Sequence, residues 1–269
     1  FPPEIRKLKP KISFLSKIFY SIIHKVFLFR ITMTKTLKDY YNKEFGEKPT
    51  YIMNTIVNTS RFVYNEVEPK CTVLDKNDRI MLCYMGNMEL EKDNIGNIIM
   101  AINQLRMEFP EITLHLYGTP REKSRTIIEN LIAKYELESH IQYKGRVQFN
   151  EVPDVLVGYD VLVTSQPKTK RAAGGFPTKL GEYLMTGVPT IATDVGEISE
   201  YVKDGIHLFL VEPENPKAYA ERLHYILKNY SQAIEIAMAA KAFVKDMFSC
   251  ENVTKEVALF IKENVEKNQ

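Results

Sequence analysis

The sequence predicts an α/β fold in which a six-stranded, mostly parallel sheet carries helices on both faces. Six short apolar runs after residue 78 are typical of buried strands, and stretches with helical spacing lie between them. Strands joined in this way need right-handed crossovers, and such sheets bind ligands at the carboxyl ends of their strands. Hydrophobic residues make up 45% and charged residues 26%, which excludes a disordered or collagen-like chain.

Two helices and a short apolar run are expected before the sheet. From Ile12 to Phe29 the apolar residues recur every three or four positions, with lysines on the other side, which predicts an amphipathic helix. A second helix is expected over residues 36–45 and ends at Gly46. The run Tyr51–Met53 follows, and the charged residues 66–78 are interpreted as a linker or irregular entry.

The strands and helices of the sheet are expected in a regular series. The strands are Ile80–Met85, Ile112–Tyr117, Ile141–Tyr143, Val161–Thr164, Thr190–Thr193 and Leu208–Val211. Helical spacing occurs between them over residues 95–105, 127–132 and 180–185. Three further helices, near residues 216–230, 232–248 and 251–263, close the chain.

The charge is unevenly distributed along the chain. The net charge of +2 is too small to indicate a nucleic-acid binder, but residues 1–49 carry 11 Lys or Arg against 4 Asp or Glu, a net +7, and the remainder carries −5. The basic stretch Ile12–Phe29 is shorter than the ~20 apolar residues that a membrane span needs. It fits either peripheral contact with an anionic membrane or a core helix of a further domain. Because the sequence starts with Phe1 rather than Met, we expect it to begin within a longer protein.

Cysteines and histidines argue against a disulfide framework or a metal centre. Cys71, Cys83 and Cys250 are odd in number and form no C-x-x-C pair, which favours a reducing, cytoplasmic compartment. The five histidines show no ligand spacing. We therefore expect no metal site and no bound cofactor.

The segment Gly174–Thr193 is the most informative chemically. Its two initial glycines let the backbone approach a ligand closely, and Pro177 suits the first position of a helix. The free amide groups of Thr178–Leu180 and the helix dipole favour an anion such as a diphosphate, and Lys179 adds a positive charge. Glu182 follows one turn later, near enough to accept hydrogen bonds from a diol.

This segment resembles the nucleotide-sugar-binding region of the retaining GT-B glycosyltransferases of the family-4 type. In that family a first glutamate touches the donor sugar, and a second one, after seven residues, binds the ribose. Glu182 matches the second glutamate, whereas Gly174 departs from the first. Other stretches that resemble the family in order and spacing are Leu82–Asn87, Glu91–Asn94, Leu114–Gly118, Ile141–Val147, Glu151–Pro153, Tyr159–Val161, Asp194–Ile198 and Val202–Gly205. The resemblance spans about residues 30–250.

The resemblance also implies which residues bind the donor. In the family an arginine and a lysine after the first donor-domain strand neutralise the diphosphate; Lys92 matches the lysine, but Asn87 replaces the arginine. The implied catalytic residues are Lys92 and Lys179, which stabilise the departing diphosphate, and Glu182, which binds the ribose. The implied donor contacts are Gly86, Asn87, Gly118, Val147, Gly175, Phe176, Pro177, Thr178 and Leu180.

The resemblance implies a division of the chain into three parts. Residues 1–61 would be the remnant of an acceptor domain and a linker, mainly helical. Residues 62–250 would form the donor domain, a Rossmann-like, six-stranded parallel sheet that is the C-terminal half of a GT-B fold. Residues 251–269 would form a helix that packs back toward the N-terminal domain. The rest of the acceptor domain would belong to the longer protein or to a separate chain.

The function that the resemblance implies is that of a bacterial-type, metal-independent, retaining hexosyltransferase. It would use a nucleotide-diphosphate sugar, with UDP favoured over GDP by family prevalence, to extend a polysaccharide or a lipid-linked glycan. It would work in the cytoplasm, with peripheral contact to the inner face of the plasma membrane through residues 12–29. Two alternatives stay open: a non-catalytic nucleotide-sugar-binding or partner module, and a GT-B-fold nucleotide-sugar epimerase.

Overall fold

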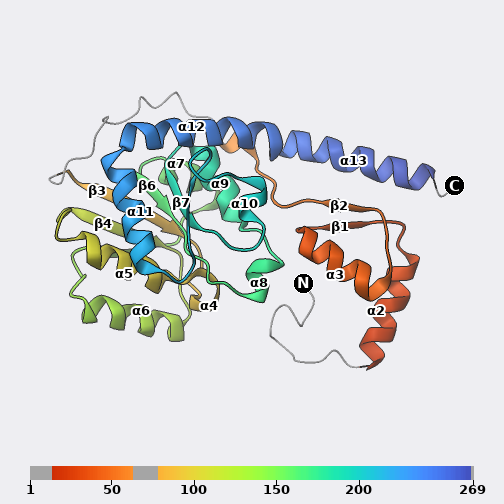
Figure 1. Cartoon of the computed structure of the whole chain (residues 1–269), viewed down its shortest axis with the longest axis horizontal. Coiled ribbons are helices and arrows are strands. Elements are labelled where there is room, and N and C mark those ends of the chain that lie inside the picture. Colours follow the sequence, from red (N-terminus) through yellow and green to blue (C-terminus); the bar gives the residue numbers. More distant parts are fainter. Residues whose placement is uncertain (1–13, 63–77, 268–269) are drawn as a thin grey trace.

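The computed structural model describes residues 14–62 and 78–267, which form a large α/β region and a smaller N-terminal region beside it (Figure 1). The large region holds a six-stranded sheet with the order β5-β4-β3-β6-β7-β8, and all its pairings are parallel. Its strands are β3 (Ile80–Met85), β4 (Ile112–Tyr117), β5 (Ile141–Gly145), β6 (Val161–Val163), β7 (Thr190–Thr193) and β8 (Phe209–Val211). The predicted six-stranded parallel sheet is confirmed.

Helices cover both faces of the sheet, as the sequence predicts. The helices and 3-10 turns of this region are α4 (Leu90–Asp93), α5 (Ile95–Leu105), α6 (Glu122–Lys134), η2 (Phe149–Glu151), α7 (Val152–Leu156), α8 (Lys170–Ala173), α9 (Thr178–Thr186), α10 (Ile198–Tyr201), α11 (Pro216–Lys228), α12 (Tyr230–Met247) and α13 (Cys250–Glu266). The largest core packs α5, α6, α11 and the start of α12 against one face. A smaller core packs α7 and α9 against the other.

The central strand β3 shows why the sheet forms where it does. Its residues are apolar throughout, and Ile80 and Leu82 are fully buried under α5 and α11, while Cys83 is buried on the opposite face. A strand buried on both faces needs an unbroken apolar run, and each fully buried aliphatic side chain contributes roughly 1.5–3 kcal/mol. β3 therefore anchors the loop that follows it at the site.

The N-terminal region contains α2 (Phe14–Val26), β1 (Arg30–Thr32), α3 (Lys35–Phe45), β2 (Thr50–Ile52) and η1 (Thr59–Phe62). β1 and β2 pair in parallel, and the helix expected over 36–45 begins one residue earlier and ends at Gly46, where φ is +84°. The expected linker over 66–78 lies outside the described residues, apart from residue 78.

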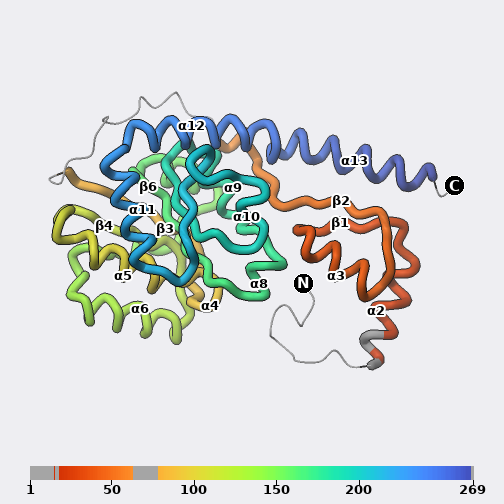
Figure 2. The backbone as a smooth tube through the Cα atoms, in the orientation of Figure 1, coloured from red at the N-terminus to blue at the C-terminus, as the bar shows by residue number. Residues whose placement is uncertain are grey.

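Residues near Val57 join the two regions. The amide of Val57 donates to the carbonyl of Phe248, and the amide of Cys250 donates to the carbonyl of Val57, at 2.8 and 2.9 Å. This bridge lies at the break between α12 and α13, and α13 then continues beyond the α/β region alongside β2 (Figure 2). Tyr51 of β2 donates a 2.6 Å hydrogen bond to Glu256 of α13. The N-terminal region is therefore attached to the α/β region at the turn between α12 and α13 and again along α13.

Candidate donor-binding site

The loops after β3 and β4 approach each other through two glycines. Gly118 has φ +120°, and a Cβ atom there would lie 1.9 Å from the carbonyl oxygen of Gly86. A Cβ atom on Gly86 would lie 2.5 Å from the hydroxyl of Tyr84 and 2.6 Å from Nζ of Lys179. Gly118 therefore needs glycine for packing alone, whereas a side chain at Gly86 would displace the ends of Tyr84 and Lys179. Their expected contact with a donor stays a prediction.

Helix α9 starts one residue later than the sequence predicts. Pro177 is the N-cap, with an extended backbone at φ −73° and ψ 102°, and the first helical residue is Thr178. The amide of Leu180 donates to the carbonyl of Pro177 at 2.9 Å, so the expectation that it is free for a ligand is wrong. The Leu180 side chain is fully buried in the core. One of the three amide donors that were expected to be free is therefore used within the first turn of the helix.

Lys179 reaches from α9 to the end of β3. Its Nζ lies 2.9 Å from a carboxylate oxygen of Asp93, and it donates to the hydroxyl of Tyr84 at 2.8 Å. The Asp93 side chain is fully buried and that of Lys179 is 17% exposed. Burial lowers the pKa of Lys179, and the charge and hydrogen bond of Asp93 oppose this effect. The positive charge that the sequence assigns to the phosphate site is thus already paired with a buried carboxylate.

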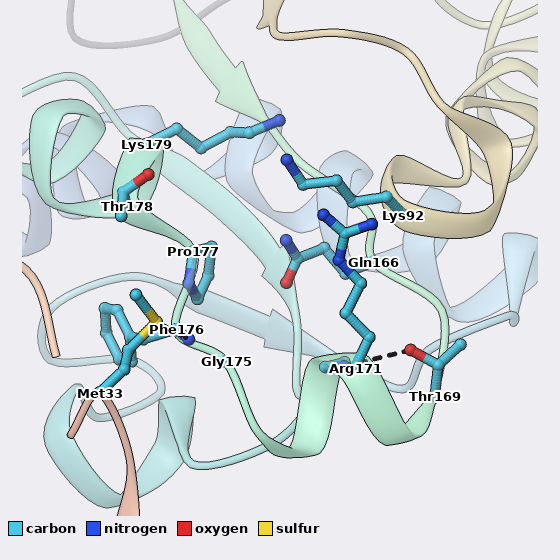
Figure 3. Close-up of a pocket in the computed structure, with 11 residues that line it drawn as sticks. Met33, Lys92, Gln166, Thr169, Arg171, Gly175, Phe176, Pro177, Thr178 and Lys179 are labelled. Atoms are coloured by element: carbon cyan, nitrogen blue, oxygen red, sulfur yellow. Dashed lines mark hydrogen bonds between the residues drawn. The ribbon is translucent and has the colours of Figure 1, made fainter. Parts of the chain in front are cut away.

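A pocket of about 210 Å³ opens beside the start of α9 (Figure 3). It brings together six of the residues that the sequence predicts for the site: Lys92, Gly175, Phe176, Pro177, Thr178 and Lys179. The remaining predicted residues, Gly86, Asn87, Gly118, Val147, Leu180 and Glu182, do not line it. The pocket also has described residues that the sequence analysis missed, namely Met33, Gln166, Thr169, Arg171 and Ala172. Gln166 and Arg171 follow β6, so the rule that ligands bind at the carboxyl ends of strands was the signal that could have found them.

Glu182 lies one turn further along α9 and has a partner of its own. Its Oε1 is 2.7 Å from Nη1 of Arg61, a residue of η1 that the sequence analysis did not assign to the site. The guanidinium of Arg61 stacks on the ring of Phe149 at 3.5 Å and donates to its carbonyl. Val147 precedes Phe149 in the same loop. Glu182, Arg61 and Phe149 therefore form a second cluster, apart from the residues that line the pocket.

The N-terminal region reaches the rim of the pocket. The amide of Phe176 donates to the thioether sulfur of Met33 at 3.2 Å, and the hydroxyl of Thr34 donates to the carbonyl of Gly174 at 3.2 Å. The carboxylate of Glu197 accepts hydrogen bonds from the amides of Lys35 and Thr36 at 2.9 and 2.7 Å. A carboxylate at the start of α3 is favoured by the helix dipole. These contacts hold the start of α3 against the donor side.

The chain can now be compared with known proteins. Residues 70–243, more than half of the chain, match the family described as "Glycosyl transferases group 1". The chain belongs to this family.

Two similar proteins are longer than this group 1 glycosyltransferase. The UDP-N-acetylglucosamine–peptide N-acetylglucosaminyltransferase GtfA subunit of Streptococcus pneumoniae is 26% identical over 141 residues, 49% of this chain and 26% of that protein. The uncharacterised glycosyltransferase MJ1069 of Methanocaldococcus jannaschii is 23% identical over 253 residues, 93% of this chain and 62% of that protein. The chain therefore spans about a quarter and about three fifths of these two relatives.

Solved structures share the fold of this group 1 glycosyltransferase. The structure of HepE from Anabaena in complex with UDP and glucose superposes with a TM-score of 0.78 at 15% identity, over 95% of this chain and 69% of that one. A sucrose-phosphate synthase from Thermosynechococcus elongatus superposes with a TM-score of 0.76 at 17% identity, over 96% of this chain and 63% of that one. At these identities the likeness shows the fold alone, which is that of the GT-B glycosyltransferases.

Residues 14–62 and 78–267 contain neither a membrane-spanning helix nor a candidate metal centre. No helix there has the length and apolar character to cross a membrane. No group of three or more His, Cys, Asp or Glu side chains in these ranges could hold a metal ion.

Proposed function

We propose that this chain binds a nucleotide-diphosphate sugar and acts as the donor half of a retaining hexosyltransferase. The observation that carries the proposal is the pocket at the start of α9, where Lys92 and the first residues of the helix line one cavity. An exposed helix N-terminus with cations beside it favours a phosphate group. The complexes of HepE with UDP and glucose, and of the pneumococcal GtfA with UDP and GlcNAc, support a UDP-sugar as the donor.

The chemistry that this half would supply is stabilisation of the leaving group. When the bond between the sugar and the diphosphate breaks, negative charge grows on the diphosphate oxygens, and donors already aimed at that position lower the barrier. Lys92 and the amides of Thr178 and Lys179 are placed for this role, while Glu182 would hold the ribose. The acceptor, a growing polysaccharide or a lipid-linked glycan, would be bound outside the donor region.

Calorimetry on the full 269-residue chain tests the binding step. We expect UDP to bind at least tenfold more tightly than UMP, and UMP more tightly than uridine, because each added phosphate meets the cationic pocket. A comparison of the affinities for GDP and UDP tests which nucleobase the site prefers. Equal affinity for UDP and uridine would contradict the proposal. Transfer or donor hydrolysis after addition of a separately encoded acceptor half would distinguish an enzyme from a binding module.

We also propose that α2 contacts an anionic membrane surface. Its side chains Leu15, Phe19 and Val26 are 77%, 61% and 74% exposed, and Lys25 is exposed among them. A basic helix with an exposed apolar face lies in the plane of the headgroups rather than across the bilayer. We expect the chain to co-sediment at low salt with phosphatidylglycerol vesicles but not with phosphatidylcholine vesicles. Val26→Ser should reduce this binding and Met107→Ser, at an exposed position of the α/β region, should not; a chain that stays in the supernatant overturns the proposal.

A further inference from the structure

Two side chains in the pocket bring positive charge to the same space from different elements. Lys92 comes from α4 and Arg171 from α8, and Figure 3 shows both pointing into the pocket beside the amide of Gln166. The described residues that line the pocket include no carboxylate. Neither cation forms an ion pair within the described part of the chain, whereas Lys179 is paired with Asp93.

The position of Arg171 is set by the short helix that carries it. Thr169 is the N-cap of α8, and its hydroxyl accepts a hydrogen bond from the amide of Ala172 at 3.1 Å. The backbone of Gly196 also lies close to this helix, because a Cβ atom there would lie 2.4 Å from the carbonyl oxygen of Ala172. Arg171 is therefore carried by a capped helical turn.

Like charges that share one cavity repel each other until an anion lies between them. The diphosphate of a nucleotide sugar carries two negative charges, which matches the charge of Lys92 and Arg171, the pocket cations that form no ion pair among the described residues. Arginine is suited to such a group because its planar guanidinium donates two parallel hydrogen bonds to phosphate oxygens. Asn87, which is exposed on the loop after β3, does not line the pocket and carries no charge.

We propose that Arg171 is a donor-binding residue that clamps the distal phosphate of the nucleotide diphosphate, with Lys92 on the opposite side. The inference rests on the proposed function, since it names a residue that holds the donor's diphosphate at the same site.

Calorimetry on the full chain with UDP and UMP tests the assignment. We expect Arg171→Ala to weaken UDP binding by about tenfold to a hundredfold and UMP binding by less than about threefold, because UMP lacks the distal phosphate. Arg171→Lys should recover part of the loss. Lys170→Ala is the matched control: it removes an exposed charge from the same helix outside the pocket lining, and it should leave both affinities unchanged.

Three results would overturn the assignment. An unchanged UDP affinity in Arg171→Ala excludes the clamp, and so does an equal loss for UDP and UMP. A selective loss for UDP-glucuronate over UDP-glucose, with UDP unaffected, would place Arg171 on a sugar carboxylate instead. If the unmodified chain binds neither UDP nor GDP, the proposed function fails first, and the clamp fails with it.

Discussion

The predicted phosphate end and ribose end of the donor site meet α9 one turn apart, and they differ in how their charged side chains are paired. At the phosphate end Lys92 and Arg171 have no anionic partner among the described residues, so a ligand would supply the anion. At the ribose end Glu182 is already paired with Arg61, which in turn stacks on Phe149. We infer that binding at the first end depends on electrostatic attraction, and at the second on an exchange of hydrogen bonds.

Breaking the buried pair behind the phosphate end should have the largest effect. Asp93→Ala leaves the ammonium of Lys179 without its carboxylate in a largely buried position, and the loss of one partner of such a pair costs about 3 kcal/mol. Urea unfolding would measure the change in the free energy of unfolding. The double variant Asp93→Ala with Lys179→Met should recover part of the stability. No difference between the single and double variants would show that the pair does not act as a unit.

Removing the charge of Lys92, which forms no ion pair among the described residues, tests the electrostatic character of the phosphate end. Lys92→Gln should weaken UDP binding by about tenfold and leave uridine binding unchanged, since uridine has no phosphate. It should also reduce the salt dependence of UDP affinity, which exposed charges create. Lys123→Gln, on α6, serves as the charge-matched control. A uniform loss for UDP and uridine would remove the distinction between the two ends.

The smallest effect is expected at the ribose end. Glu182→Ala should weaken UDP and uridine alike, by about tenfold or less, because it removes hydrogen bonds to hydroxyl groups rather than an ion pair. It should also abolish the preference for UDP over 2′-deoxy-UDP. Arg61→Ala, which removes the ion-pair partner of Glu182 but keeps Glu182 itself, should give about a threefold loss of the same pattern. If Arg61→Ala strengthens binding instead, Arg61 competes with the ribose for Glu182.

Local sequence patterns were sufficient for most of the fold. The strands Ile80–Met85, Ile112–Tyr117 and Thr190–Thr193 have the predicted bounds, because apolar periodicity is a property of neighbouring residues. The edge strand beside β4 differs: the predicted run Ile141–Tyr143 extends to Gly145, since a register shift at Leu116 and Tyr117 lets β4 pair further along it. The end of an edge strand is thus decided by its neighbour.

The chemistry at the start of α9 was also accessible from local sequence. Glycines, a proline and a lysine within six residues indicate an anion site whatever surrounds them, and the structure places Gly175–Lys179 around one pocket. The prediction that the amide of Leu180 is free was wrong. That amide bonds to Pro177 because the first turn of the helix is tight, and residue types do not specify this backbone geometry.

The sequence by itself determined the parallel sheet, the helix whose start lines the pocket and the positive charge of the side chains there. Only the tertiary structure decided which charges are neutralised and which remain available. Asp93 and Lys179 are 86 positions apart, and Arg61 and Glu182 are 121 positions apart. Pairs at such separations form where the crossovers of the sheet bring loops together, and no periodicity within a single element encodes that meeting.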